Sequence, residues 1–190
     1  SLDLRSDLPE FEFKIDSSRV DIGMLLAGLN IAEGIDATVG SFGLDLTIRG
    51  SSLRTILHRS EFSAQMKDGN WTIRDPNTNA SLKIRILECV VAASAGQPVT
   101  WVIDSLIKEE PVKIEIKGDR LAALAAEKVR LPLDIIAETA VVQLKLDSVI
   151  DLPFEPNKVD FKMSLSGERI DSINNFLEVD LPPYGPYELG

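Results

Sequence analysis

The sequence has few of the side chains on which most metalloproteins and disulfide-stabilised proteins depend. It has one cysteine, Cys89, and one histidine, His58, among 190 residues. A single cysteine excludes an intrachain disulfide and a thiolate cluster, and a single histidine excludes a multi-histidine zinc site. No apolar run approaches the roughly 18 residues that a membrane-spanning helix needs. We expect Cys89 to be a buried structural thiol and His58 to lie on the surface or at a helix end.

Positive charge is also scarce, since 20 lysines and arginines face 30 acidic residues and give a formal net charge of −10. Nucleic-acid binding needs a basic face that neutralises phosphates, and anionic membrane surfaces attract basic segments. The composition therefore predicts no nucleic-acid partner and no simple electrostatic adhesion to a membrane. With 44% hydrophobic residues, we expect one domain over residues 1–190, which begins and stops in mid-pattern like a fragment of a longer protein.

Motifs for catalysis and metal binding are weak. The sequence contains no G-x-S-x-G elbow and no glycine-rich nucleotide loop. The segment Asp75-Pro-Asn77-Thr-Asn79 begins like a calcium loop, but Ala80 and Ile86 stand where that loop needs glycine and glutamate. Glycoside hydrolysis needs only two carboxylates, an alternative that 30 acidic residues leave open. Nearly all of them occupy outward strand positions or turns, so we expect no enzyme activity, no metal and no cofactor.

What the sequence does contain is a phrase that occurs three times. Each copy is an alternating strand, a glycine and the first turn of an amphipathic helix. The copies are Leu44-Asp-Leu-Thr-Ile48-Arg-Gly50-Ser-Ser-Leu53, Val112-Lys-Ile-Glu-Ile116-Lys-Gly118-Asp-Arg-Leu121 and Phe161-Lys-Met-Ser-Leu165-Ser-Gly167-Glu-Arg-Ile170, with a weaker one from Phe11. Because side chains alternate across a strand, each copy places apolar residues on one face and charges on the other. Such repetition indicates an extended array that presents a long surface.

Similar alternation recurs along most of the chain. It predicts strands at Phe11–Ile15, Leu44–Ile48, Phe62–Met66, Trp71–Ile73, Leu82–Ile86, Val99–Ile103, Val112–Ile116, Leu131–Ile135, Val142–Leu146 and Phe161–Leu165. A sheet with one solvent-exposed polar face and one apolar face is typically antiparallel. The dipeptide Asp68-Gly69 predicts a hairpin between two of these strands.

Helices are predicted to be few and short. We expect one through His58 that is capped by Ser51 or Ser52, and one over Leu121 to Leu124 that is capped by Asp119. Two more are expected along Ile170 to Leu177 and over Val20 to Leu29. The predicted fold class is therefore a β-dominated α+β fold. It is a long, twisted, mostly antiparallel sheet with short helices inserted after the repeated strands.

The end of the chain carries a further signature. Val179-Asp-Leu181-Pro-Pro-Tyr184-Gly-Pro-Tyr187 follows the third helix, and it resembles the closing turn of the AsmA family of bacterial envelope proteins. The phrase Leu46-Thr-Ile-Arg-Gly50-Ser-Ser-Leu53-Arg-Thr-Ile56-Leu57 and the opening Leu2-Asp-Leu-Arg-Ser-Asp-Leu-Pro9 are similar to that family as well. The similarity covers roughly residues 2–190, and it departs at Ser17-Ser18, where the other phrases have glycine.

The resemblance implies a periplasmic protein held to the inner membrane by an N-terminal helix that this chain does not include. It further implies a role in outer-membrane biogenesis, envelope proteins as partners, and movement of glycerophospholipid along a β-lined groove. Since open sheet edges add strands readily, we also expect that the isolated chain can dimerise through its edges.

The residues lead to a related hypothesis by themselves. About ten strands with one apolar face exceed what four short helices can cover, so either the sheet folds back or the face stays open as a trough for acyl chains. The residues predicted to line it are Leu44, Leu46, Ile48, Val112, Ile114, Ile116, Phe161, Met163 and Leu165. The alternative is a closed hydrophobic core in a structural or protein-interaction module without a lipid ligand.

The proline turn has two interpretations. Prolines fix the backbone and stop the preceding helix, so Tyr184 and Tyr187 are expected to clamp the turn onto neighbouring strands. The other interpretation is that the two tyrosines dock a partner protein.

Overall fold

The structure is a computed structural model that describes residues 10–24, 35–74, 80–121, 123, 129–152, 160–174 and 180–190. It contains one sheet of ten strands, in which each strand pairs antiparallel with the next along the chain. The strands are β1 (Glu10–Asp21), β2 (Ile35–Arg49), β3 (Glu61–Arg74), β4 (Ser81–Ala93), β5 (Pro98–Ile107), β6 (Glu110–Arg120), β7 (Val129–Glu138), β8 (Val142–Leu152), β9 (Asp160–Gly167) and β10 (Tyr187–Leu189). The predicted β-dominated, antiparallel fold is confirmed.

Two short helices have described bounds, α2 (Leu53–Arg59) and η3 (Ile170–Ile173). Helix α2 begins after Ser52, whose side chain accepts a hydrogen bond from the Thr55 N–H at 3.3 Å. The Ser52 N–H donates in turn to the Thr55 hydroxyl at 3.0 Å, so two otherwise unpaired donors are satisfied. The predicted helix through His58 is therefore confirmed, and of the two candidate caps it is Ser52 that caps it. His58 lies exposed in its last turn.

The predicted hairpin at Asp68-Gly69 is wrong. Strand β3 runs without interruption from Glu61 to Arg74 and keeps its register with β4 on both sides of this dipeptide. Asp68 does have the positive φ of 55° that the hairpin prediction expected, but the backbone bends there and continues. The sequence pattern identified the unusual conformation and assigned it to the wrong structure.

Two helix predictions also need correction at their starts. Val20 belongs to β1, and only residues 22–24 are helical in the described part of the predicted helix to Leu29. Asp119, the predicted cap of the next helix, is still in strand β6, although Leu121 is helical as predicted. Leu124 of the same prediction lies outside the described residues. The predicted stripe from Ile170 begins as η3, and its last predicted residue, Leu177, lies outside the described residues.

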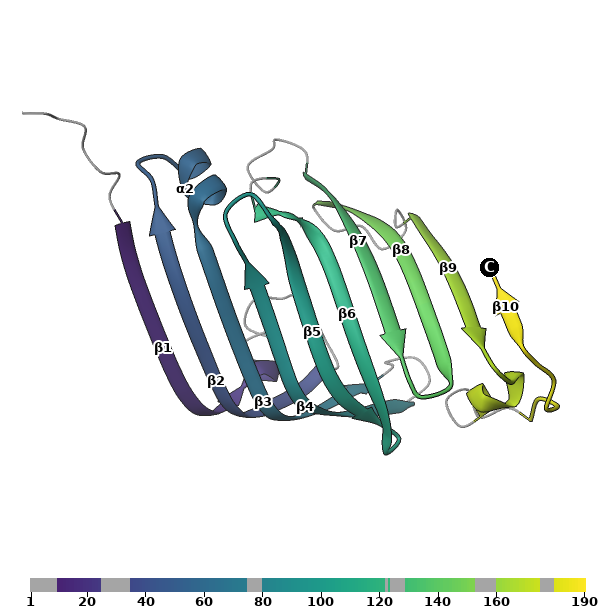
Figure 1. The fold of residues 1–190 in the computed structure, drawn as a ribbon. Coiled ribbons are helices and arrows are strands. Elements are labelled where there is room, and N and C mark those ends of the chain that lie inside the picture. Colours follow the sequence, from purple (N-terminus) through teal and green to yellow (C-terminus); the bar gives the residue numbers. More distant parts are fainter. Residues whose placement is uncertain are drawn as a thin grey trace, which may run out of the picture.

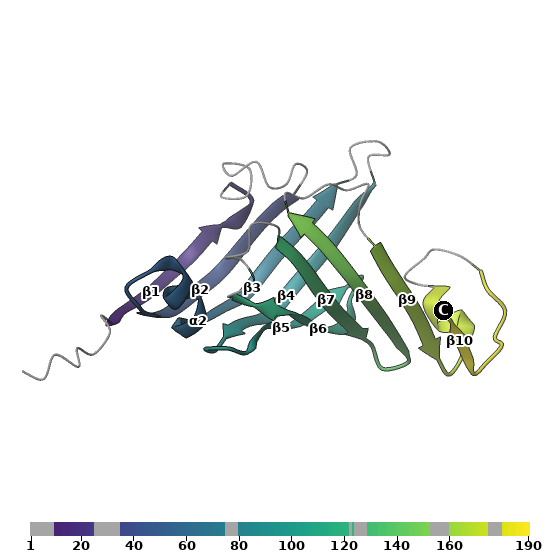
Figure 2. The same ribbon diagram turned by 90° about the horizontal axis from the view of Figure 1, so that it is seen from above.

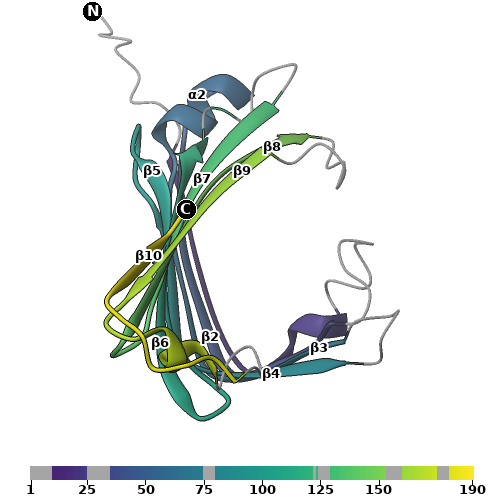
Figure 3. The same cartoon turned by 90° about the vertical axis from the view of Figure 1, so that its right-hand side faces the viewer.

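The sheet is open and strongly curved. β1 and β10 lie at its opposite ends, and α2 sits at the ends of the strands β2 and β3 that it connects (Figure 1). From above, β1–β4 and β7–β9 run in different directions because the sheet twists (Figure 2). Seen along the stacking direction, the sheet has a C-shaped cross-section with its hollow to the right (Figure 3). Nine strand spacings of about 4.8 Å make this hollow roughly 43 Å long.

The strand register divides the residues between an apolar and a polar face. On the apolar face Phe13 lies opposite Leu46, which lies opposite Phe62. On the polar face, ion pairs join neighbouring strands. For example, Arg49 of β2 lies 2.9 Å from Glu10 of β1. Because a one-residue slip would exchange the two faces, this alternation fixes the register.

A corner runs across the first four strands. Arg19, Gly40, Asp68 and Leu87 occupy successive positions of one cross-strand row. Arg19 and Asp68 have φ values of 57° and 55°, while β4 has a register shift against β5 between Ile86 and Glu88. A Cβ on Gly40 would stand 3.0 Å from the Cβ of Asp68, so glycine permits the close approach. Figure 3 shows β3 and β4 bending sharply.

The corner shifts the alternation of side chains by one residue. In β2 the odd-numbered Ala37 and Val39, which precede the corner at Gly40, are buried, with 0% and 2% exposure. After the corner, the even-numbered Leu44 and Leu46 face inward. The shift therefore keeps apolar residues on the inner face where the strands turn. This is the physical reason for the positive φ of Asp68.

Candidate functional site: an apolar trough

The apolar face lines the hollow of the curved sheet, and we call it the trough. Among the described strands, the non-glycine residues that are buried lie on this face: Ala37, Val39, Ile86, Cys89, Ala93, Val99, Ser105, Val112 and Ser148. Neither α2 nor η3 spans the sheet (Figure 1), and the curvature of the sheet crowds side chains on its inner face. The outer face carries the charged residues.

The structure places all nine predicted lining residues in the trough. They occupy three separate regions, which are the C-terminal half of β2, the middle of β6 and strand β9, next to the edge strand β10. Leu44, Leu46 and Ile48 pair with apolar residues of β1, Val112, Ile114 and Ile116 pair across β5 and β6 with one serine among their partners, and Phe161, Met163 and Leu165 face β8. The prediction that they share one face is thus correct, but the three groups do not form one compact pocket.

The apolar side chains are most exposed near the two ends of the trough. At one end Phe11 and Phe13 of β1 are 56% and 51% exposed, and at the other Phe161 and Met163 of β9 are 67% and 50% exposed. Large apolar groups that remain in water in a contiguous strip mark surfaces that bind another apolar molecule. The ends of the trough are therefore open to a ligand that extends across the strands.

An apolar cavity of about 360 Å³ deepens the trough under η3. Its walls are Ile107, Val112, Ala137, Thr139, Val142, Leu144, Met163, Leu165 and Ile173. The hydroxyl of Thr139 accepts hydrogen bonds from the backbone N–H groups of Val141 and Val142 at 3.2 and 3.0 Å. This cavity thus has no free side-chain hydrogen-bonding group in its walls.

Two buried serines in the trough are also satisfied by the backbone. Ser105 donates to the carbonyl oxygen of Val112 at 2.9 Å, and Ser148 donates to that of Leu133 at 3.5 Å. Since buried polar groups are costly when unpaired, these bonds make the serines compatible with an apolar lining. The trough suits hydrocarbon better than a sugar or a peptide, which would need polar partners.

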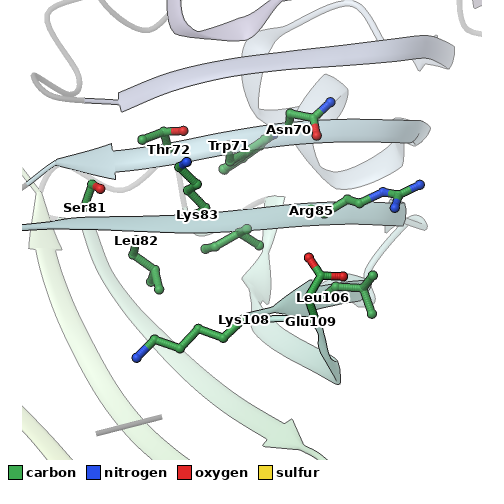
Figure 4. Close-up of a pocket in the computed structure, with 11 residues that line it drawn as sticks. Asn70, Trp71, Thr72, Ser81, Leu82, Lys83, Arg85, Leu106, Lys108 and Glu109 are labelled. Atoms are coloured by element: carbon green, nitrogen blue, oxygen red, sulfur yellow. The ribbon is translucent and has the colours of Figure 1, made fainter. Parts of the chain in front are cut away.

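A second hollow of about 450 Å³ has a mixed lining at the far ends of β3 and β4 (Figure 4). Lys83 and Arg85 of β4 and Lys108 of the β5–β6 turn contribute cations to its lining. Glu109 contributes a carboxylate, and Leu82 is among the apolar residues. The indole Nε1 of Trp71 is buried there without a hydrogen-bond partner among the described residues. This hollow can hold a ligand with both polar and apolar parts, unlike the cavity under η3.

The proline turn packs against the end of β9. The backbone N–H of Ile170 donates to the carbonyl of Tyr184 at 2.6 Å, and Asn174 forms two hydrogen bonds with the backbone of Leu181. Tyr187 pairs with Gly167, where an added Cβ would stand 2.7 Å from the tyrosine hydroxyl. Tyr187 therefore clamps the turn, whereas Tyr184 is 74% exposed and only its side chain is available for docking.

Other candidate groups have simpler roles. Cys89 is 4% exposed in the trough, and burial raises the pKa of its thiol. The described ranges contain no group of three or more potential metal ligands. They also contain no helix that is long and apolar enough to cross a membrane. Residues 75–79, whose sequence begins like a calcium loop, lie outside the described residues.

Sequence analysis missed part of the trough for identifiable reasons. Leu144 stands in a predicted strand, but its place in the cavity depends on Ile173 of η3, which lines the same cavity. Ala37 and Val39 were missed because the strand was expected to begin only at Leu44. The alternation of Ile35, Ala37 and Val39 was the available signal, interrupted by the one-residue shift at Gly40.

In comparisons with known proteins, no family model, no curated protein and no solved structure matches this chain. The geometry defines the chain as an open, one-sided β-sheet with an apolar trough. Its membership of the AsmA family stays a prediction from the sequence resemblance.

Proposed function

We propose that this chain cradles the acyl chains of a lipid in its trough. The supporting observation is that the apolar face of a ten-stranded sheet is concave and has partly exposed large apolar side chains near both ends, Phe11 and Phe13 at one and Phe161 and Met163 at the other. A closed core would have covered these side chains. A hydrocarbon chain laid across the strands would remove them from water together with its own methylenes.

The energetics favour an extended apolar ligand. Each buried methylene contributes about 0.8 kcal/mol, so ten methylenes supply about 8 kcal/mol before the loss of ligand freedom is counted. The trough walls donate few hydrogen bonds, since Ser105, Ser148 and Thr139 are all engaged with the backbone. Selection would therefore depend on hydrocarbon length and shape, while a polar headgroup would remain near solvent.

The biological setting follows from the sequence resemblance alone. If the chain is an AsmA-like segment, it acts without catalysis in the periplasm, in outer-membrane biogenesis, and its parent is anchored in the inner membrane. Its ligand would then be a phospholipid, and other envelope proteins would be its partners. The competing proposal is a scaffold module that binds proteins and no lipid, for which the exposed Tyr184 is the supporting observation.

Binding of a fluorescent polyene fatty acid, cis-parinaric acid, separates the two proposals. We expect saturable fluorescence enhancement, and we expect Met163→Asp to weaken binding at least tenfold because it places a charge against the hydrocarbon. Val102→Asp is the matched control, since Val102 is 37% exposed on the polar face. Absence of binding to folded protein, or equal loss in both variants, would support the scaffold.

A further inference from the structure

The two edges of the sheet differ in their protection. β10 has three residues, pairs only with Leu165–Gly167, and follows a turn with Pro182, Pro183 and Pro186. β1 has twelve residues, almost all exposed, and its outer edge has no partner among the described strands. Natural sheets blunt their edges with short strands and prolines. Here only the β10 edge has these features, so β1 is the edge available for strand addition.

The sequence of β1 is complementary to itself. In an antiparallel pair of two β1 strands centred on Phe13, Phe13 lies opposite its copy and Phe11 lies opposite Ile15 of the second copy. On the other face, Glu12 of each copy lies opposite Lys14 of the other, which gives two attractive pairs. Like charges meet only at the outermost positions, where Glu10 of each copy lies opposite Asp16 of the other. Glu10 is already paired with Arg49 of its own chain, at 2.9 Å.

Neighbouring registers are less favourable. A shift by two residues in one direction puts Glu12 opposite Glu12 of the second copy, and a shift in the other direction puts Lys14 opposite Lys14. A shift by one residue would place phenylalanines against charged side chains. The register centred on Phe13 is therefore selected by both faces of the strand.

We propose that β1 is a self-association edge, through which two copies of this chain pair antiparallel about a two-fold axis at Phe13. The axis is perpendicular to the sheet, so the apolar faces of both copies lie on the same side. The partly exposed Phe11, Phe13 and Ile15 then become the middle of a trough that continues through twenty strands. Lys14 lies 3.6 Å from Asp45 within its own chain and bridges this carboxylate to Glu12 of the second copy.

A charge-swap experiment tests the register. Sedimentation velocity should show a concentration-dependent dimer of the wild-type chain. Glu12→Lys and Lys14→Glu, each alone, turn two attractive pairs into two repulsive ones and should weaken self-association roughly tenfold or more. Mixing the two variants restores both pairs, so native mass spectrometry with one variant ¹⁵N-labelled should show mainly heterodimers. Lys145→Glu on the polar face of the interior strand β8, far from β1, is the control and should dimerise like wild type.

Three results would overturn the proposal. The first is a folded wild-type chain that remains monomeric at about 1 mM, the limit of weak association. The second is a dimer unaffected by either single variant, as expected if two troughs closed face to face. The third is a mixture that forms no more dimer than the single variants. Circular dichroism of each variant establishes that it is folded, and none of these outcomes depends on lipid binding.

Discussion

Gly185 lies directly against the backbone of Glu168, and a Cβ at position 185 would stand 1.8 Å from the Glu168 carbonyl oxygen. The contact joins the proline turn to the segment between β9 and η3. It explains in steric terms why the chain has glycine between Tyr184 and Pro186. The closing turn is therefore part of the packed structure and fixes β10 beside β9.

Gly185→Ala is predicted to destabilise this end of the molecule. The methyl group must displace backbone, and overpacking of this kind costs about 1–3 kcal/mol. Urea unfolding should show the loss, and hydrogen exchange should be faster for the amides with which β9 and β10 pair. Gly190→Ala is the control, because nothing lies within 4 Å of a Cβ there. Equal stability of both variants would mean that the turn is not packed as described.

Asp68→Val is predicted to destabilise the corner of the sheet. A β-branched residue tolerates the left-handed region poorly, at a cost of about 1–2 kcal/mol. Asp68→Asn retains a residue type that adopts this conformation and should leave the urea midpoint nearly unchanged. If valine and asparagine behave alike, Asp68 does not have the positive φ that the corner requires.

The pKa of Asp171 is predicted to respond to Arg169. The guanidinium hydrogen-bonds both carboxylate oxygens, at 3.0 and 2.5 Å, and this pairing lowers the pKa of Asp171. A carboxyl whose folded pKa is depressed stabilises the fold above its unfolded pKa, and this contribution is lost as the pH falls through the folded pKa. A ¹³C NMR titration should show the Asp171 pKa rising in Arg169→Gln. An unchanged value would contradict the ion pair.

Cys89 is predicted to react with thiol reagents only after unfolding. Its side chain is 4% exposed, and burial raises its pKa and so disfavours the reactive thiolate. Labelling by Ellman's reagent at pH 8 should be slow in native protein and should accelerate with urea in parallel with the loss of circular dichroism. Rapid native labelling would place Cys89 outside the buried lining of the trough.

Local patterns in the sequence predict the antiparallel sheet well, because alternation is a property of neighbouring residues. Leu44, Ile116 and Leu165 were assigned to one face correctly on this basis. The corner was not predicted, because a positive φ at Asp68 fits a hairpin turn as well as a bent strand. The bend depends on the pairing of Asp68 with Gly40 and of Gly40 with Arg19, which lie far away in the sequence. The cavity under η3 was also missed, because it arises from contacts between elements distant in the chain.

The most direct test of the trough is native mass spectrometry of the protein purified from a bacterial host, with lipid extraction of the same sample. The account predicts stoichiometric phospholipid that is lost in Ile116→Asp or Leu165→Asp when these variants remain folded, and retained in Val102→Asp. A well-folded wild-type protein that carries no lipid, and takes none up from phospholipid vesicles, would contradict the account and favour a scaffold.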